Sequence, residues 1–229
     1  MEAKYKVGDL VDINRDNEIL QVKVFGYFEG QNGIIYSVRT DDGFIILVDE
    51  SDIIMYRPWI AFFSQTGSEI VEVSKLLGRW PDMIVTNERP EHLRKIHPAL
   101  ESKHLVFVEN KPTEEELSMI LGQYGNPLIT LHGWLRIMPP YICNRFEIYN
   151  GHPGLITEYP ELKGKDPQQK AFDLGLDFSG CVIHKVTEGV DEGEILRSRK
   201  VSIKGLEIGE LFHILHSISV SLWVDFLKN

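Results

Sequence analysis

The spacing of hydrophobic residues changes near Pro58, and the change divides the sequence into two parts. Before Pro58, short β-rich runs alternate with Gly, Asn and Asp, and none of them has a helical period. After Pro58, compact apolar runs alternate with segments whose apolar residues recur at helical spacing. We therefore predict two domains, residues 1–57 and 58–229.

The first domain contains four β-rich runs, which are KYKVGDLVDI, LQVKVFGYFEG, GIIYSVRTDDG and FIILVDESDII. Four or five short strands in so few residues predict a small all-β barrel. We expect its core to hold Tyr27, Phe28, Tyr36 and Phe44, with contact to a nucleotide base as the alternative role of these aromatic rings. The domain itself is expected to pack on the second domain or to mediate self-association as a homo-oligomer.

The second domain has the alternation of strands and helices that builds an α/β, Rossmann-like, mostly parallel sheet. Strands are expected at 59–64, 82–87, 105–109, 127–134 and 146–150, an antiparallel pair at 180–186 and 192–203, and a closing helix at 206–227. Another helix is expected within 165–175, with Asp166 as its cap, Pro167 in its first turn and Gly175 at its exit.

Composition and charge narrow the class of partner. The chain has 43% hydrophobic and 25% charged residues, which are ordinary values for a globular protein. Its net charge of -10 disfavours a nucleic-acid partner, because phosphate backbones are repelled. Cys143 and Cys181 make no disulfide or metal pattern. No signal peptide opens the sequence and no run of about 18 apolar residues occurs, so we expect a cytoplasmic protein without a membrane partner.

Candidate chemistry lies where strands are expected to end. In open α/β sheets, ligands bind beyond the carboxyl ends of the strands. Asn150 and His152 fall at such an end, two residues apart, so both side chains face one side of an extended segment. Asp191 follows in a glycine-flanked loop. An amide, an imidazole and a carboxylate, without the G-x-S-x-G pattern of a serine nucleophile, suit acyl transfer directly onto an amine.

The segment from Leu131 to Leu196 resembles the folate-dependent formyltransferases, the group that contains glycinamide ribonucleotide and methionyl-tRNA formyltransferases. Three motifs carry the resemblance, in that family's order and spacing: HGWLRIMPP, YNGHPGLITEYPEL and SGCVIHKVTEGVDEGEIL. A weaker likeness extends back to Ile60. The resemblance implies that Asn150, His152 and Asp191 are catalytic.

It also implies 10-formyltetrahydrofolate as the formyl donor, and no metal. The residues at the matching cofactor positions are Trp134, Leu135, Arg136, Ile137, Met138, Thr187, Glu188, Gly189 and Val190. A flat heterocycle needs apolar walls, which Trp134, Ile137, Met138 and Val190 would supply. For Trp134, a place in the core is the equally weighted alternative, and His184 is open to the same two interpretations.

The acceptor is expected to be a primary amine on a small, phosphorylated molecule, either a glycinamide ribonucleotide-like compound or an amino-sugar nucleotide. Thr66, Gly67 and Ser68 resemble the phosphate-binding loop of the glycinamide ribonucleotide enzymes, and capping of a helix is the alternative role of this loop. Gly151, Gly154 and Thr157 depart from the family motif. We interpret them as the mark of a changed acceptor, with Gly154 in contact with substrate.

Three alternatives keep the same residues in other roles. A hydrolase would release formate from the same donor, and a non-catalytic module would bind a folate or a nucleotide without turnover. A metal hydrolase would use His132, His152, His184 and Asp191, but the sequence offers no closely spaced ligand pair for it.

Overall fold

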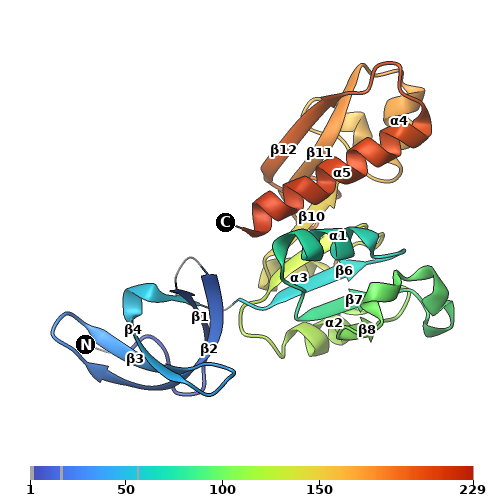
Figure 1. Cartoon of the computed structure of the whole chain (residues 1–229). Coiled ribbons are helices and arrows are strands. Elements are labelled where there is room, and N and C mark those ends of the chain that lie inside the picture. The colour runs from blue at the N-terminus through green and yellow to red at the C-terminus, as the bar shows by residue number, and fades with distance from the viewer. Residues whose placement is uncertain (1–2, 16–17, 56, 229) are drawn as a thin grey trace. The chain divides into compact units, whose positions relative to one another are not determined.

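The computed structural model describes residues 3–15, 18–55 and 57–228. The chain forms two compact units, Met1–Arg57 and Pro58–Asn229 (Figure 1). Each unit has its own hydrophobic cores. That the two units are a barrel domain and a catalytic domain stays a prediction.

The first unit is built from one antiparallel sheet with the strand order β4-β3-β2-β1-β5. Its strands are β1 (Leu10–Arg15), β2 (Glu18–Glu29), β3 (Ile34–Arg39), β4 (Ile45–Asp49) and β5 (Ile53–Met55), with a 3-10 turn at Glu50–Asp52. Apolar side chains alternate along β3, where Ile34, Tyr36 and Val38 are buried. The unit is therefore built from β-strands, as predicted. Closure of its sheet into a barrel stays a prediction.

The expectation that four aromatic rings fill this core is wrong for three of them. Tyr36 is fully buried, but Tyr27, Phe28 and Phe44 are 52%, 48% and 71% exposed. Phe28 pairs with Ile35, which points to the face opposite Tyr36, and Phe44 lies in the turn before β4. A bulge after Val24 also shifts the register of β2, so its apolar residues no longer all face the core.

The second unit is an α/β fold around a mixed seven-stranded sheet with the order β12-β11-β10-β9-β6-β7-β8. The strands are β6 (Trp59–Phe63), β7 (Met83–Thr86), β8 (Leu105–Phe107), β9 (Leu128–His132), β10 (Ile148–His152), β11 (Phe178–Lys185) and β12 (Ile195–Ser202). The first five are parallel, and β10–β11 and β11–β12 pair antiparallel. The mostly parallel sheet with a final antiparallel pair is thus present, and the finer Rossmann-like description stays a prediction.

Helices cover both faces of this sheet. They are α1 (Ser68–Leu77), α2 (Glu114–Leu121), α3 (Pro140–Arg145), α4 (Pro167–Asp173) and α5 (Ile208–Leu227), with 3-10 turns at Pro90–Lys95, Pro98–Leu100 and Pro160–Leu162. Alternate residues of β6 enter two separate cores. Trp59, Ala61 and Phe63 pack with residues of α1 and α5, while Ile60 and Phe62 pack with residues of α2 and α3.

Two local predictions need correction. The strand β10 does not stop at Asn150 but continues through His152, because its main chain pairs with β9 on one side and β11 on the other. Asp166 occupies the N-cap position of α4, but it has a left-handed φ of 54° and its side chain makes no capping hydrogen bond. Pro167 at the first helical position and Gly175 after the helix, with φ 61°, behave as expected.

Gly151 is required by close packing between β10 and α5. A Cβ atom built on Gly151 would lie 2.5 Å from Nε1 of Trp223, whose side chain is fully buried. The absence of a side chain at 151 therefore makes room for the closing helix. This is a packing reason for a residue that the sequence suggested was a mark of acceptor choice.

We expect Gly151→Ala to lower the free energy of unfolding by about 1–3 kcal/mol, because overpacking a tight core forces neighbouring groups to shift. The matched control is Gly209→Ala in the first turn of α5, where an added Cβ meets nothing within 4 Å. It should leave stability unchanged or raise it slightly. Chemical denaturation followed by circular dichroism measures both variants, and equal stabilities would contradict the packing account.

Candidate active site

Strands β10 and β11 and the loop after β11 bring the predicted catalytic side chains together at the end of β10. Nδ1 of His152 lies 3.3 Å from Oδ2 of Asp191. The other carboxylate oxygen, Oδ1, lies 3.3 Å from Nε2 of His184 on β11. Nδ2 of Asn150 lies 3.1 Å from the same His184 nitrogen. Asn150, His152 and Asp191 are thus neighbours, and His184 links the first to the last.

Strand pairing explains why these side chains meet. Asn150 lies directly opposite His184 in the antiparallel register of β10 and β11, and opposite residues in such a pair project to the same face. His152 is two residues further along β10 and so faces the same side. Asp191 reaches them from the loop between β11 and β12, with a left-handed φ of 51°.

The main chain holds the carboxylate in place. The Gly164 N–H donates a 2.8 Å hydrogen bond to Oδ2 of Asp191. Burial alone raises the pKa of Asp191, but its contacts with His184 and His152, whose protonated forms the carboxylate stabilises, and the hydrogen bond from Gly164 outweigh burial and lower the pKa to about 2. Asp191 is therefore ionised throughout the pH range in which folded proteins usually work.

The two imidazoles each face a main-chain carbonyl with their outer nitrogen. Nε2 of His152 donates to the Leu162 oxygen at 2.8 Å, and Nδ1 of His184 donates to the Lys185 oxygen at 3.0 Å. A carbonyl only accepts, so in the neutral rings the inner nitrogens carry lone pairs that face Asp191. An additional proton on either ring would convert its contact with Asp191 into a hydrogen bond. The cluster is built to take up a proton.

His152 is nevertheless neutral before that proton arrives. Burial lowers its pKa below the ordinary 6.5, and the charge of Asp191 and the bond to Leu162 only partly offset this. A neutral imidazole beside an ionised carboxylate is the resting state of a general base, because the carboxylate stabilises the imidazolium once it forms. His184 is the member of this cluster for which sequence reasoning left a core role open.

The predicted cofactor residues fall in several different environments. Thr187, Glu188 and Gly189 line a cavity of about 470 Å³ together with Cys143, Asn144, Lys185 and Val186. Among the apolar candidates, Trp134 and Met138 are buried in the core with α2 and α3, with Trp134 edge-on to Phe62. In contrast, Leu135, Ile137 and Val190 are 46%, 72% and 50% exposed.

Arg136 has a structural task of its own. Its Nε donates to the Asn110 main-chain oxygen at 2.6 Å and its guanidinium also contacts the Asn110 side chain. It therefore ties the segment after β9 to the loop after β8. Its role in holding a cofactor stays a prediction.

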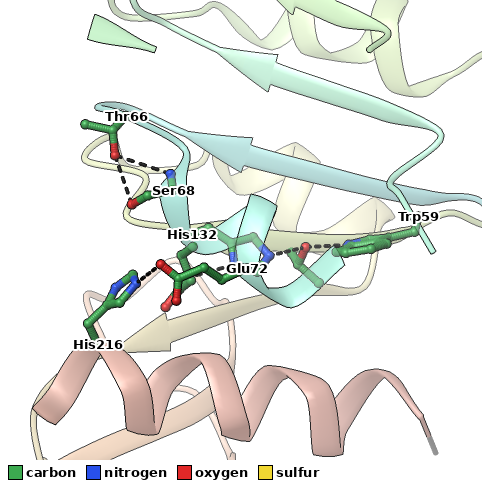
Figure 2. Close-up of polar contacts among 8 residues, drawn as sticks. Trp59, Thr66, Ser68, Glu72, His132 and His216 are labelled. Carbon is green, nitrogen blue, oxygen red and sulfur yellow. Dashed lines mark hydrogen bonds and ion pairs between the residues drawn. The ribbon is translucent and has the colours of Figure 1, made fainter. Parts of the chain in front are cut away.

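The predicted substrate loop lines a second cavity, of about 220 Å³. Thr66, Gly67 and Ser68 form its wall at the start of α1, and Gly151 and Pro153 bring it to the end of β10. At the start of the helix, the Ser68 N–H donates to Thr66 Oγ1 at 3.3 Å and the two hydroxyls are 3.1 Å apart (Figure 2), while the N-cap residue Gly67 offers no capping side chain. Gly154 is buried instead, and a Cβ there would meet His152 and Pro167.

Glu69 and His132 also line this second cavity, and the sequence did not indicate that their side chains contact each other. Nδ1 of His132 lies 2.9 Å from Oε2 of Glu69, and the His132 side chain is fully buried. The available signal was a histidine at the end of a buried strand, but its partner is 63 residues away in sequence. Within the described ranges, no group of three or more His, Cys, Asp or Glu side chains is arranged to hold a metal ion.

The fold and the site together define an α/β protein with a carboxylate held between two imidazoles at a strand end. Residues 66–210 match the formyl transferase family model, and the chain belongs to this family. It is 31% identical over 125 residues to a methionyl-tRNA formyltransferase of Thermosipho africanus, a match that covers 54% of this chain but only 40% of that relative.

Solved structures show the same fold for the second unit. A phosphoribosylglycinamide formyltransferase of Streptococcus pneumoniae aligns with a TM-score of 0.65 at 22% identity, covering 76% of this chain and 98% of that one. A formyltetrahydrofolate deformylase of Pseudomonas syringae pv. tomato aligns with a TM-score of 0.62 at 17% identity, covering 80% and 63%. At these identities, the likeness establishes the fold alone. No helix among the described residues is long and apolar enough to span a bilayer.

The pKa of His152 gives a test of the cluster that needs no substrate. In an NMR titration of its ring, the pKa should lie below 6.5 because the side chain is buried. Asp191→Asn should lower it further, because an uncharged amide no longer stabilises the imidazolium.

Asp177→Asn is the control for this titration, since Asp177 is an exposed carboxylate that pairs with Lys204. It should leave the His152 pKa unchanged. A pKa that rises in Asp191→Asn would show that the carboxylate does not act on this ring.

Proposed function

We propose that this protein is a folate-dependent N-formyltransferase, which moves a formyl group from 10-formyltetrahydrofolate to a primary amine of a small molecule. The observation that carries the proposal is the Asp191 carboxylate between two imidazole nitrogens, next to the amide of Asn150. Family membership supports the reaction class.

The chemistry needs a proton acceptor and a stabiliser of negative charge. The amine nitrogen attacks the formyl carbon, and the carbonyl oxygen becomes an oxyanion that the Asn150 amide stabilises by hydrogen bonding. The amine proton passes to the His152–Asp191–His184 cluster. When the bond from the formyl carbon to the folate nitrogen breaks, the same proton is available to that nitrogen. Atoms and charge balance without a covalent enzyme intermediate.

We assign the donor to the 470 Å³ cavity beside Cys143. Thr187, Glu188 and Gly189 border it, and the polar groups of such a loop suit the edge of a heterocycle that both donates and accepts hydrogen bonds. The exposed side chain of Val190 adjoins this wall in sequence and would supply apolar contact. In this assignment, Trp134 and Met138 support the wall from the core rather than touching the donor.

The acceptor in this proposal is a small amine rather than a transfer RNA. The net charge of -10 opposes a nucleic acid. The second cavity, at 220 Å³, is smaller than the roughly 300–1,000 Å³ of sites for drug-sized ligands, so it suits a single ring or a short chain.

A 10-formyltetrahydrofolate hydrolase is the second candidate, favoured by the likeness in fold to a deformylase. The same cluster would then take its proton from water instead of an amine. A non-catalytic binding module is the third. It gives no physical reason for a buried carboxylate to lie between two imidazoles, since such a pairing is costly to desolvate.

His152→Ala and Asp191→Asn should each lower kcat/KM for formyl transfer by at least about 100-fold, the usual effect of removing a general base or the group that stabilises it. Mass gain of the acceptor measures the transfer. Circular dichroism must show that both variants remain folded.

Asp177→Asn is again the matched control and should retain full activity. Near-normal transfer by either site variant would remove its proposed role. Formate is measured in the same samples without an acceptor, and release at the rate of transfer would identify the hydrolase instead.

Protection of a thiol tests the donor cavity. Cys143 lines the cavity and is 8% exposed, while Cys181 is fully buried, and burial raises the pKa of both thiols. We expect Cys143 to react slowly with an aromatic disulfide reagent and Cys181 to react only after unfolding.

Saturating 10-formyltetrahydrofolate should slow the Cys143 reaction at least tenfold. Cys143→Ala, which should abolish the reaction, identifies the modified residue. An unchanged rate at saturating donor would move the donor out of this cavity.

A further inference from the structure

We propose that the 220 Å³ cavity at the start of α1 binds an uncharged, hydroxyl-bearing part of the acceptor, such as a sugar ring, and disfavours a phosphate. This inference rests on the proposed function, because it assigns the cavity to the acceptor. It concerns the loop of Thr66, Gly67 and Ser68, for which the sequence suggested phosphate binding.

The cavity lies beside the catalytic strand. Gly151 and Pro153 line it, and they flank His152 in the chain. A molecule held there would have one end near the imidazole that accepts the amine proton. Its other end would lie among α1 and residues of α5, including Phe212, His216 and Ser219.

A chain of hydrogen bonds determines the charge of this cavity. Trp59 Nε1, which only donates, bonds to Thr130 Oγ1 at 2.7 Å, and this leaves the Thr130 hydroxyl proton for Nε2 of His132 at 2.9 Å (Figure 2). The ring proton of His132 then lies on Nδ1 and is donated to Glu69 at 2.9 Å. His132 thus orients the Glu69 carboxylate without cancelling its charge.

Glu69 stays ionised in this arrangement. Burial raises its pKa, but the hydrogen bonds from His132 and Ser219 lower it more, so the net direction is downward. The carboxylate accepts hydrogen bonds and repels anions. It sits one residue after Ser68, in the first turn of the helix whose N-terminus would otherwise attract a phosphate.

The described lining offers a phosphate no Lys or Arg, and two of its other donors are already bonded. None of the described residues that line the cavity is Lys or Arg. The Ser68 N–H is bonded to Thr66, and His216 is paired with Glu72 at 3.1 Å (Figure 2). A phosphate in this cavity would therefore meet a carboxylate and no fixed cation.

The same lining suits a polyol. Gln65 and Gln168 contribute amides that both donate and accept, and the Glu69 carboxylate accepts from hydroxyl groups. Phe212, 46% exposed at the wall, offers an apolar face to the ring. These are the polar and apolar contacts that a neutral ring with several hydroxyls can satisfy together.

Three related amines separate the possibilities. Glycinamide has no sugar, glycinamide riboside adds hydroxyls, and glycinamide ribonucleotide adds a phosphate. Their binding to the full chain is measured without formyl donor, from NMR shifts of residues 65–69. We expect the riboside to bind at least tenfold more tightly than either of the others. Equal or tighter binding of the ribonucleotide or of glycinamide, or no binding of the riboside, would overturn the proposal.

Glu69→Gln keeps the size of the side chain and removes its charge, so it should shift the preference toward the ribonucleotide at least tenfold. Asp177→Asn should leave the preference unchanged. If Glu69→Gln does not fold, the wild-type protein gives the second measurement, because added salt screens repulsion and should tighten binding of the ribonucleotide alone. Weaker ribonucleotide binding in salt would contradict the repulsion.

Binding and turnover are scored separately in this design. If the riboside binds most tightly but no formyl transfer occurs with any of the amines, the proposed function is contradicted and the cavity assignment stands. Formyl transfer together with tighter binding of the ribonucleotide would contradict the cavity assignment and leave the proposed function intact.

Discussion

The contact of one carboxylate with two imidazoles is the constraint on which the rest of the second unit depends. Asp191 is 10% exposed in its side chain and faces His152 and His184 at equal distances of 3.3 Å. A buried charge is costly unless hydrogen-bonding groups surround it, so the loop that carries it must be held firmly. The Gly164 N–H and the paired strands β10 and β11 provide that support. Moving any of these elements would leave the charge without partners.

This arrangement also separates two tasks in space. The cavity beside Cys143 lies between α3 and the loop after β11, whereas the cavity beside Thr66 lies between α1 and α5. The residues around Asp191 belong to β10, β11 and the loop that follows β11. The first cavity is lined by that loop and the second by the end of β10, so both cavities adjoin the cluster in the chain. A donor on one side and an acceptor on the other would meet at the end of β10, where Asn150 and His152 are presented. The sheet thus acts as a scaffold that positions the loops of the site.

The features that distinguish this chain are coupled through Trp223. Its ring fills the space that a side chain at Gly151 would occupy and packs 4.5 Å from the ring of His132. His132 in turn orients Glu69. The glycine, the buried histidine and the carboxylate form one packed group, so a change at one of them is felt at the others. The closing helix consequently explains the glycine between Asn150 and His152, whereas its link to acceptor choice stays a prediction.

The sequence by itself determined the order of the strands in the second unit and the presence of its closing helix, although not the short helix α3, because hydrophobic period and turn residues are local signals. It also pointed to Asn150, His152 and Asp191, since their motifs carry residue types suited to proton transfer, and the structure places them together. Tertiary structure alone decided what is nonlocal. The link through His184, the pairing of Glu69 with His132, and the exposure of Phe28 and Phe44 depend on strand register and on partners distant in sequence. A one-residue difference in register reverses the face of every side chain in a strand, and the bulge after Val24 makes such a change within β2.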